Sequence, residues 1–309
     1  MFTLRRRVRF SLTAGLIPLA VTACGGGHVP LPTFTPATIG DTAGLVRRGE
    51  YLVRYVAICG HCHAADPKKD VEGSLSGGME FRNWRLGTIR ASNITPDSAT
   101  GIGAWSDAEI VRAIRNGEDR DGDVLAPVMP YAWFNGMSDR DALAIVRYLR
   151  TLPPVRNVVK SDHNLAYRIG EWFFLKPMKE RVVKEPARAA HAEYGRYLVH
   201  HGALCADCHT PRGGLQAKPK MDLLLAGEPD PPKGFPANPA NLTPDSATGI
   251  GKWTEAEFLR TLRTGEDPAG EELHEFMPWR QFGNMSDDDL RAIYRYLRTV
   301  KPIKQRIPD

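Results

Sequence analysis

The sequence predicts an all-α fold made of two tandem domains of the same kind, each with short helices around a centre that their own side chains do not fill. Three observations lead to this prediction. The chain contains an internal repeat, and each copy carries the caps and periodicity of short helices. The stretches between those helices are rich in Gly, Pro, Asn and Asp.

The internal repeat is the clearest sign of domain organisation. Three long segments return later in the chain, in the same order and at nearly constant spacing: 48–63 as 194–209, 93–119 as 241–267, and 128–151 as 276–299. The longest pair reads NITPDSATGIGAWSDAEIVRAIRNGED and NLTPDSATGIGKWTEAEFLRTLRTGED. Solenoid repeats are much shorter than these copies. The repeat therefore predicts two domains of one fold, at residues 45–155 and 190–305.

Both copies carry the signals of short helices. Ser106 with Glu109, and Thr254 with Glu257, have the Ser/Thr-x-x-Glu spacing of a capping box. Apolar residues recur at helical spacing after these capping boxes. They do so again in the last helix of each copy, which in the first copy starts at Ser138. Few alternating runs lie between the helices, so strands are not expected. Short helices around so much irregular chain indicate that another group fills each centre.

Two triplets, NIT at 93–95 and NLT at 241–243, match the pattern of a glycosylation acceptor. They recur at the same place in both copies. This repetition favours a structural loop over a modification site.

The segment between the two domains, residues 156–189, is too apolar for a free linker. It contains LAYRIGEWFFL, whose Trp172, Phe173 and Phe174 are expected to pack against a domain. We therefore predict a packed linker.

The first 23 residues have the features of an export signal. A basic start, RRRVR, precedes the apolar run FSLTAGLIPLAVTA, which is too short and interrupted for a permanent membrane span. Small aliphatic residues before Cys24 and glycines after it resemble the lipobox of bacterial lipoproteins. We predict a signal peptide at 1–23, lipidation of Cys24, and a flexible or extended tether over 24–44. Ordinary cleavage nearby, with an unmodified cysteine, is the alternative.

The charge of the chain does not favour a nucleic-acid partner. The formal net charge is +5 at pH 7, but four of the arginines lie in the predicted leader, and the remaining chain carries +1. A nucleic-acid-binding protein concentrates basic residues on one face. Hydrophobic residues make up 42% and charged residues 25%, which is typical of a soluble globular protein.

The other four cysteines form two pairs, each followed by a histidine: CGHCH at 59–63 and CADCH at 205–209. A four-cysteine zinc site has its pairs roughly 15–20 residues apart, far closer than these two. A thioredoxin-like dithiol needs a βαβ context, which surrounds neither pair. Structural disulfides would leave the histidine after both pairs unexplained.

Attachment of a c-type haem explains that histidine. The two thiols add to the haem vinyl groups, and the next residue is then held against the iron as an axial ligand. We predict two covalently attached haem c groups, bound by Cys59, Cys62, Cys205 and Cys208 and ligated by His63 and His209. The remaining histidines, including His61, His200, His201 and His274, have no counterpart at the matching position and are expected to be surface or packing residues.

The sixth ligand of each iron is expected to be a methionine. A haem that only carries electrons has both axial positions filled, and a thioether raises its potential. Two methionine pairs recur in both copies. Met137 and Met285 directly precede helix starts, where an apolar residue usually packs as a staple. Met129 and Met277 are followed by proline, which stiffens the loop, and we predict these two as the ligands.

The order of short helix, CxxCH, long loops, Met-Pro and closing helix resembles class I cytochrome c, twice. The resemblance implies two tandem class I cytochrome c domains, each with short helices around a covalently bound haem. It also implies that the first and last helices cross through a small residue and an aromatic, at Gly49 with Tyr148 and at Gly195 with Tyr296.

Two further segments, the NITPDxxTGIGxW blocks and YRIGEWFFL, are similar to those of a narrower group. They resemble the multihaem cytochrome c subunits of periplasmic alcohol and gluconate-type dehydrogenases. Those subunits typically carry three haems, whereas this chain has two motifs.

The expected function is that of a dihaem electron carrier rather than an enzyme. It passes single electrons between a dehydrogenase or other donor and a respiratory cytochrome or oxidase, in the periplasm or cell envelope, with an N-terminal lipid as its membrane attachment. Both copies keep Met-Pro, so no catalytic residue is expected. One alternative is a peroxidase-like dihaem oxidoreductase, which needs a displaceable axial ligand. Another is a subunit whose main task is to dock a dehydrogenase.

Overall fold

The computed structural model describes residues 28–35, 40–64, 74–83, 87–165, 167, 175–213, 218–231 and 237–308. The predicted signal peptide, Cys24, and the aromatic residues Trp172, Phe173 and Phe174 lie outside these ranges. What the sequence predicts for them stays a prediction.

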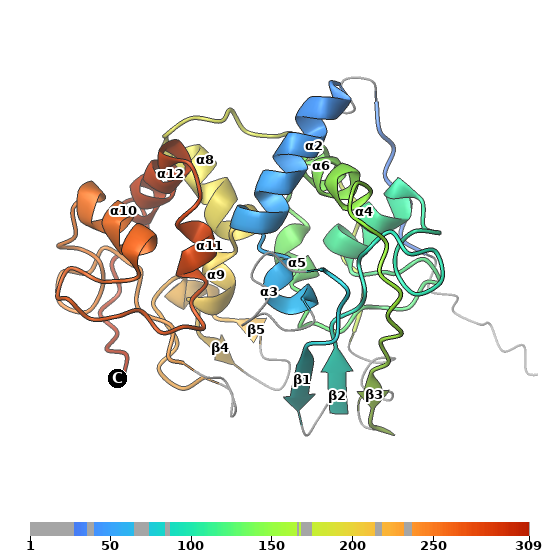
Figure 1. Ribbon diagram of the computed structural model, residues 1–309. Helices are drawn as coiled ribbons and strands as arrows, with labels where there is room; N and C mark the ends of the chain where they lie inside the picture. Colours follow the sequence, from blue (N-terminus) through green and yellow to red (C-terminus); the bar gives the residue numbers. More distant parts are fainter. Residues whose placement is uncertain are drawn as a thin grey trace, which may run out of the picture.

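The first repeat forms a series of short helices connected by long loops (Figure 1, blue to green). In order these are α2 (Thr42–Tyr51), the π-helical turn η1 (Leu52–Val56), α3 (Gly60–His63), α4 (Asp107–Asn116), α5 (Tyr131–Phe134) and α6 (Asp139–Leu149).

The second repeat forms the corresponding helices in the same order (Figure 1, yellow to red). They are α8 (Ala192–Tyr197), the π-helical turn η2 (Leu198–Gly202), α9 (Cys205–Cys208), the 3₁₀ turn η3 (Met221–Leu223), α10 (Glu255–Thr264), α11 (Trp279–Phe282) and α12 (Asp287–Leu297). The all-α prediction is therefore right for most of the regular structure.

Short strands, which the sequence did not predict, complete the fold. In the first repeat, β1 (Glu80–Asn83) pairs antiparallel with β2 (Gly87–Arg90), and β2 pairs with β3 (Asp162–His163). In the second, β4 (Arg212–Gly213) pairs with β5 (Lys218–Pro219). Strands of two to four residues are too short to show an alternating pattern. Moreover, β3 reaches β2 only because the folded chain brings the linker there.

Helix starts are capped as the sequence predicts. Ser106 and Glu109 form a full capping box at α4, and Thr254 and Glu257 do the same at α10. Each hydroxyl or carboxylate satisfies an amide that the helix leaves unpaired. Ser138 caps α6 by accepting a hydrogen bond from the amide of Asp141.

The first and last helices of each repeat cross at a glycine. A Cβ on Gly49 of α2 would lie 1.9 Å from the carbonyl oxygen of Ala144 on α6, and one on Gly195 of α8 would lie 1.8 Å from that of Ala292 on α12. The same Cβ positions are 2.7 Å from the Cβ of Tyr148 and 2.9 Å from that of Tyr296. The expected crossing through a small residue and an aromatic is confirmed, because no larger residue permits this approach.

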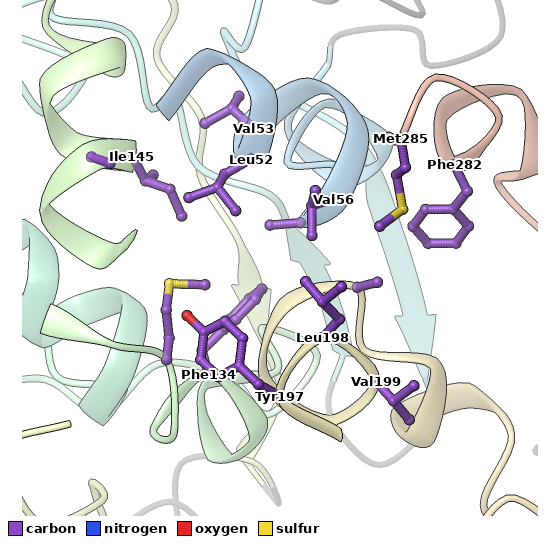
Figure 2. Packing of buried hydrophobic residues seen from close by; sticks show 14 of the residues in the cluster. Leu52, Val53, Val56, Phe134, Ile145, Tyr197, Leu198, Val199, Phe282 and Met285 are labelled. Atoms are coloured by element: carbon purple, nitrogen blue, oxygen red, sulfur yellow. The ribbon is translucent and has the colours of Figure 1, made fainter. Parts of the chain in front are cut away.

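The two repeats share one hydrophobic core. Figure 2 shows Leu52 and Val56 of η1 on one side of the boundary and Leu198 of η2 on the other. All three side chains are at most 1% exposed. Figure 1 shows the two repeats side by side, with α2 and α6 next to α8 and α12.

A buried ion pair lies at the same boundary. Arg48 donates hydrogen bonds of 2.8 and 2.9 Å to the two oxygens of Asp141, and a third of 3.2 Å to the Tyr194 hydroxyl of the second repeat. Burial alone raises the pKa of Asp141, but the Arg48 charge and its hydrogen bonds leave this pKa below its usual value.

The NIT and NLT triplets form structural loops, as predicted. Asn93 and Thr95 are 3% and 0% exposed. The Asn93 amide donates to the carbonyl of Val155 at 2.8 Å, and its oxygen accepts from the Thr95 hydroxyl at 2.7 Å. Asn241 makes the corresponding 2.8 Å bond to Ile303. Each loop thus ties the segment after the last helix to the body of its repeat.

The segments flanking the first repeat pack against it where they are described. Residues 28–35 belong to no helix or strand but are not free, because Glu118 accepts from the amide of Val29 at 2.9 Å and lies 3.1 Å from His28 Nδ1. Helix α2 begins at Thr42, within the last residues of the predicted tether over 24–44. In the linker, the amide of Met178 donates to the carbonyl of Asn116 at 2.8 Å. Within the described ranges, no helix is long and apolar enough to cross a membrane.

Candidate functional site

Each CxxCH motif begins directly after a strained backbone position. Ile58 has φ 44° and Leu204 has φ 56°, and both immediately precede the first cysteine of their motif. This left-handed region is unfavourable for residues with a Cβ and is an outlier for a β-branched one. The π-helical turns η1 and η2, a kind of turn frequent at functional sites, lead into these positions. Both repeats thus hold the same strain at the same place.

The cysteines of each motif lie on one turn of helix with their histidine. The amide of His63 donates to the carbonyl of Cys59, and that of His209 to Cys205, both at 2.9 Å. The thiols are not joined as disulfides. Desolvation by burial raises the pKa of Cys59 to about 12 and that of Cys62 to about 11. A reactive dithiol instead has a lowered thiol pKa, so this environment does not favour a redox dithiol.

A zinc site also lacks support from the geometry. In the part of the chain that the structure describes, no three side chains of His, Cys, Asp or Glu converge as metal ligands. Structural zinc is held by four such ligands.

Both histidines are oriented by a backbone carbonyl. His63 Nδ1 lies 2.7 Å from the Ser92 oxygen, and His209 Nδ1 lies 2.7 Å from the Ala240 oxygen. A carbonyl only accepts, so Nδ1 carries the proton and Nε2 keeps its lone pair. Desolvation lowers the pKa of both imidazoles, against the opposing effect of these hydrogen bonds. A neutral, fixed imidazole with a free Nε2 fits an axial ligand of haem iron.

Met137 and Met285 lie in the hydrophobic core. Their side chains are 0% and 1% exposed. Figure 2 shows Met285 beside Phe282, within the shared core. Thioether side chains commonly fill gaps of this kind.

Met129 and Met277 have different surroundings. Both are half-buried, lie in loops, and pack against the edge of the core. The residue after the proline bonds back to each methionine carbonyl, at 2.8 Å from the amide of Tyr131 and 2.7 Å from that of Trp279. This repeated loop geometry leaves the thioether outside the packed interior and supports the choice of this pair as candidate ligands.

The two sites contact one another across the repeats. Helix α5 packs on η2, and α11 packs on η1. His201 Nδ1 lies 2.8 Å from the carbonyl oxygen of Trp133. The ring of His61, inside the first motif, meets that of Phe276 edge-on at 5.3 Å.

Asp207, inside the second motif, also takes part in this contact. Desolvation raises the pKa of its carboxyl, while the charge of Arg212 and, to a smaller extent, the interaction with the Trp133 side chain act in the opposite direction. Sequence reasoning treated His61 and His201 as surface or packing residues, because neither has a histidine counterpart. The one signal available in the sequence is their place, since His61 lies within a CxxCH motif and His201 lies four residues before the first cysteine of the other.

Comparison with known proteins places the chain in a family. The profile of the family described as cytochrome c matches residues 192–301, in the second repeat. A protein of Cereibacter sphaeroides named "Diheme cytochrome c-type" is 32% identical over 309 residues, which cover 96% of this chain and 100% of that protein. The chain belongs to the cytochrome c family.

This cytochrome c is also similar to cytochrome c subunits of dehydrogenases, which are longer than this chain. It is 31% identical over 277 residues to the cytochrome c subunit of a quinone alcohol dehydrogenase from Gluconacetobacter polyoxogenes, covering 84% of the chain and 57% of the subunit. It is 31% identical over 292 residues to the gluconate 2-dehydrogenase cytochrome c subunit of Pantoea cypripedii, covering 87% of the chain and 63% of the subunit. The chain thus spans little more than half the length of these two relatives.

Membership of the cytochrome c family implies covalently bound haem c, and the residues described above fit that group. The haem supplies one-electron chemistry. What the chain itself provides is a pair of thiols on one helical turn, an oriented neutral imidazole, and a thioether on a proline-stiffened loop.

Proposed function

We propose that this cytochrome c carries two haem groups and passes single electrons between protein partners, without a catalytic reaction of its own. The duplication of the whole site supports the proposal. In both repeats a strained turn precedes CxxCH, a carbonyl at the matching position orients the histidine, and a Met-Pro loop has the same backbone bonds. The same duplication supports two tandem class I cytochrome c domains, at 45–155 and 190–305.

The residues of each repeat have separate roles in this proposal. The cysteines would bind the haem covalently, the histidine would be the proximal ligand, and the methionine would be the sixth ligand. In the first repeat these are Cys59, Cys62, His63 and Met129, and in the second Cys205, Cys208, His209 and Met277.

The surroundings of these residues suit electron transfer. The Ser92 and Ala240 carbonyls hold the two imidazoles in one orientation. Pro130 and Pro278 stiffen the loops that carry the methionines. Ligands that do not move between redox states keep the reorganisation small, and a thioether favours the reduced iron.

A dehydrogenase is the proposed electron donor. Two of the relatives are named as cytochrome c subunits of an alcohol and a gluconate dehydrogenase. We propose a similar donor here and a respiratory cytochrome or oxidase as acceptor. We further propose export to the periplasm or cell envelope and attachment to a membrane through a lipid on Cys24.

Haem content tests the central proposal. The protein is expressed in a host that attaches haem c, and covalent haem is measured per polypeptide after denaturation. We expect two haems in the native chain and one in the Cys205→Ala/Cys208→Ala double variant. A single haem in the native chain would contradict the proposal.

A second experiment tests the partner. The native protein is purified in gentle detergent, and the proteins that accompany it are identified. A dehydrogenase at equal stoichiometry supports the proposed donor, and reduction of the haems by that enzyme with its substrate provides the functional check.

A further inference from the structure

We propose that His201, a residue of the second repeat, is a positioning residue for the haem site of the first repeat. It holds the loop that carries Met129. The inference rests on the proposed function, because it takes Met129 as an iron ligand.

The contact begins at the imidazole of His201. Its Nδ1 lies 2.8 Å from the carbonyl oxygen of Trp133 in α5. Burial lowers the pKa of His201, against the opposing effect of this bond, and Arg181 and Arg196 lower it further. The neutral ring donates from Nδ1, since the carbonyl can only accept.

The ring also closes on the chain after α5. A Cβ placed on Gly136 would lie 2.2 Å from Cε1 of His201. His201 therefore contacts α5 near its end and the turn that follows, so its ring limits where this short helix can lie.

Backbone hydrogen bonds connect α5 directly to Met129. Pro130 is the residue before α5, and its carbonyl accepts from the amides of Trp133 and Phe134 at 3.0 and 3.1 Å. The amide of Tyr131 in turn bonds to the Met129 carbonyl at 2.8 Å. Only one helical turn separates the Trp133 carbonyl, which His201 contacts, from the candidate ligand Met129.

A second contact from the second repeat also restrains α5. The Trp133 side chain interacts with the carboxyl of Asp207, which lies between Cys205 and Cys208. The loop of the first site is thus held by the segment that attaches the second haem. We infer that methionine ligation in the first repeat depends on the folded attachment segment of the second.

The reciprocal contact, of the first repeat with α11 beside Met277, has different residues at the matching positions. Tyr55 corresponds to His201, and Gln281 corresponds to Trp133. There the contact is the edge-on packing of His61 on Phe276. Tyr55 is therefore a matched control position, on the turn of the first repeat that corresponds to the turn of His201.

The test uses three variants at His201 in the haem-loaded, full-length protein. His201→Phe keeps a ring and removes the donor. His201→Asn places an amide N–H near the position of Nδ1 and should rescue. His201→Gln places its N–H further out and should behave as His201→Phe. All are made in a Met277→His background, so that the long-wavelength absorbance of methionine-ligated ferric haem arises from Met129 alone.

The readouts are this absorbance during titration with imidazole, and the midpoint potential of the methionine-ligated haem. Loss of one hydrogen bond should lower, by about fivefold, the imidazole concentration at which half of the Met129 ligation is displaced. The potential should fall with it. His201→Asn and the control Tyr55→Phe should behave as the parent.

Two results separate the positioning role of His201 from the proposed function. If His201→Phe and His201→Gln both retain the parent's imidazole midpoint and potential, the positioning role of His201 is overturned. If the Met277→His parent shows no methionine absorbance, Met129 is not the ligand and the proposed function itself fails. Should His201→Phe fold poorly, the comparison of His201→Gln with His201→Asn carries the same decision.

Discussion

Tyr51 of the first repeat donates a 2.7 Å hydrogen bond to Asp289 of the second, and its hydroxyl also accepts from the amide of Ser286 at 2.9 Å. The corresponding contact runs in the other direction, from Tyr197 to Asp141 at 2.8 Å. The repeats thus exchange one contact about a pseudo-two-fold axis. Each tyrosine fixes the start of the last helix in the other repeat, so the two candidate sites share one framework.

Removing one of these hydroxyls should destabilise the boundary. Tyr197→Phe leaves Asp141 and the amide of Ser138 short of a partner inside the protein. We expect the free energy of unfolding to fall by about 1–3 kcal/mol. Tyr51→Phe should cost less, because Tyr51 is only half-buried. Urea unfolding measures both losses, and equal losses would contradict the role of burial.

A methyl group at the helix crossing should be poorly tolerated. Gly49→Ala forces a Cβ against the backbone carbonyl of Ala144, which cannot move without separating α2 from α6. We expect a loss of about 3 kcal/mol or more, and low yields of folded protein. Gly202→Ala is the control, because the nearest neighbours of its added Cβ are side-chain methyl groups of Val56 and Leu198, at the longer distances of 3.2 and 3.3 Å, and not a backbone carbonyl. A smaller change in thermal midpoint for Gly49→Ala than for the control would contradict the crossing.

His200 should make stability fall in mildly acidic solution. Burial lowers its pKa to about 4, and repulsion from His201 and Arg196 acts in the same direction. The unfolded histidine, with a pKa near 6.5, binds the proton more readily. Its contribution is therefore complete above about pH 6.5 and is lost as the pH falls toward about 4.

The variant His200→Gln tests this pH dependence. Glutamine can keep a hydrogen bond to the Tyr296 hydroxyl, which lies 2.7 Å from His200 Nε2, but it does not titrate. The difference in urea midpoint between about pH 7 and about pH 5 should shrink in the variant. An unchanged difference would assign the effect to other groups.

Carbon monoxide should distinguish the electron carrier from the peroxidase-like alternative. With both irons six-coordinate, the reduced protein should not bind it rapidly at stoichiometric amounts. Met129→Ala should open one site and bind one equivalent. Met137→Leu, a volume-conserving change in the core, should leave binding as in the native protein. Rapid binding to the native protein would favour a displaceable ligand.

Much of the candidate site could be predicted from the sequence because its chemistry is local. CxxCH, the capping boxes and Met-Pro each lie within a few residues, and duplication made them stand out from chance. The preference for Met129 over Met137 also rested on a local signal, the following proline. The difference in their burial agrees with that preference.

The sequence by itself predicted the two repeats, their capped and closing helices, and the candidate residues for holding a haem, since these depend on spacing along the chain. Only the tertiary structure decided how the repeats meet. The contacts of His201 with Trp133 and of Tyr51 with Asp289 join residues 68 and 238 positions apart. No periodicity or motif links residues at such separations. The short strands belong to the same category, because β3 is a strand only where the folded linker meets β2.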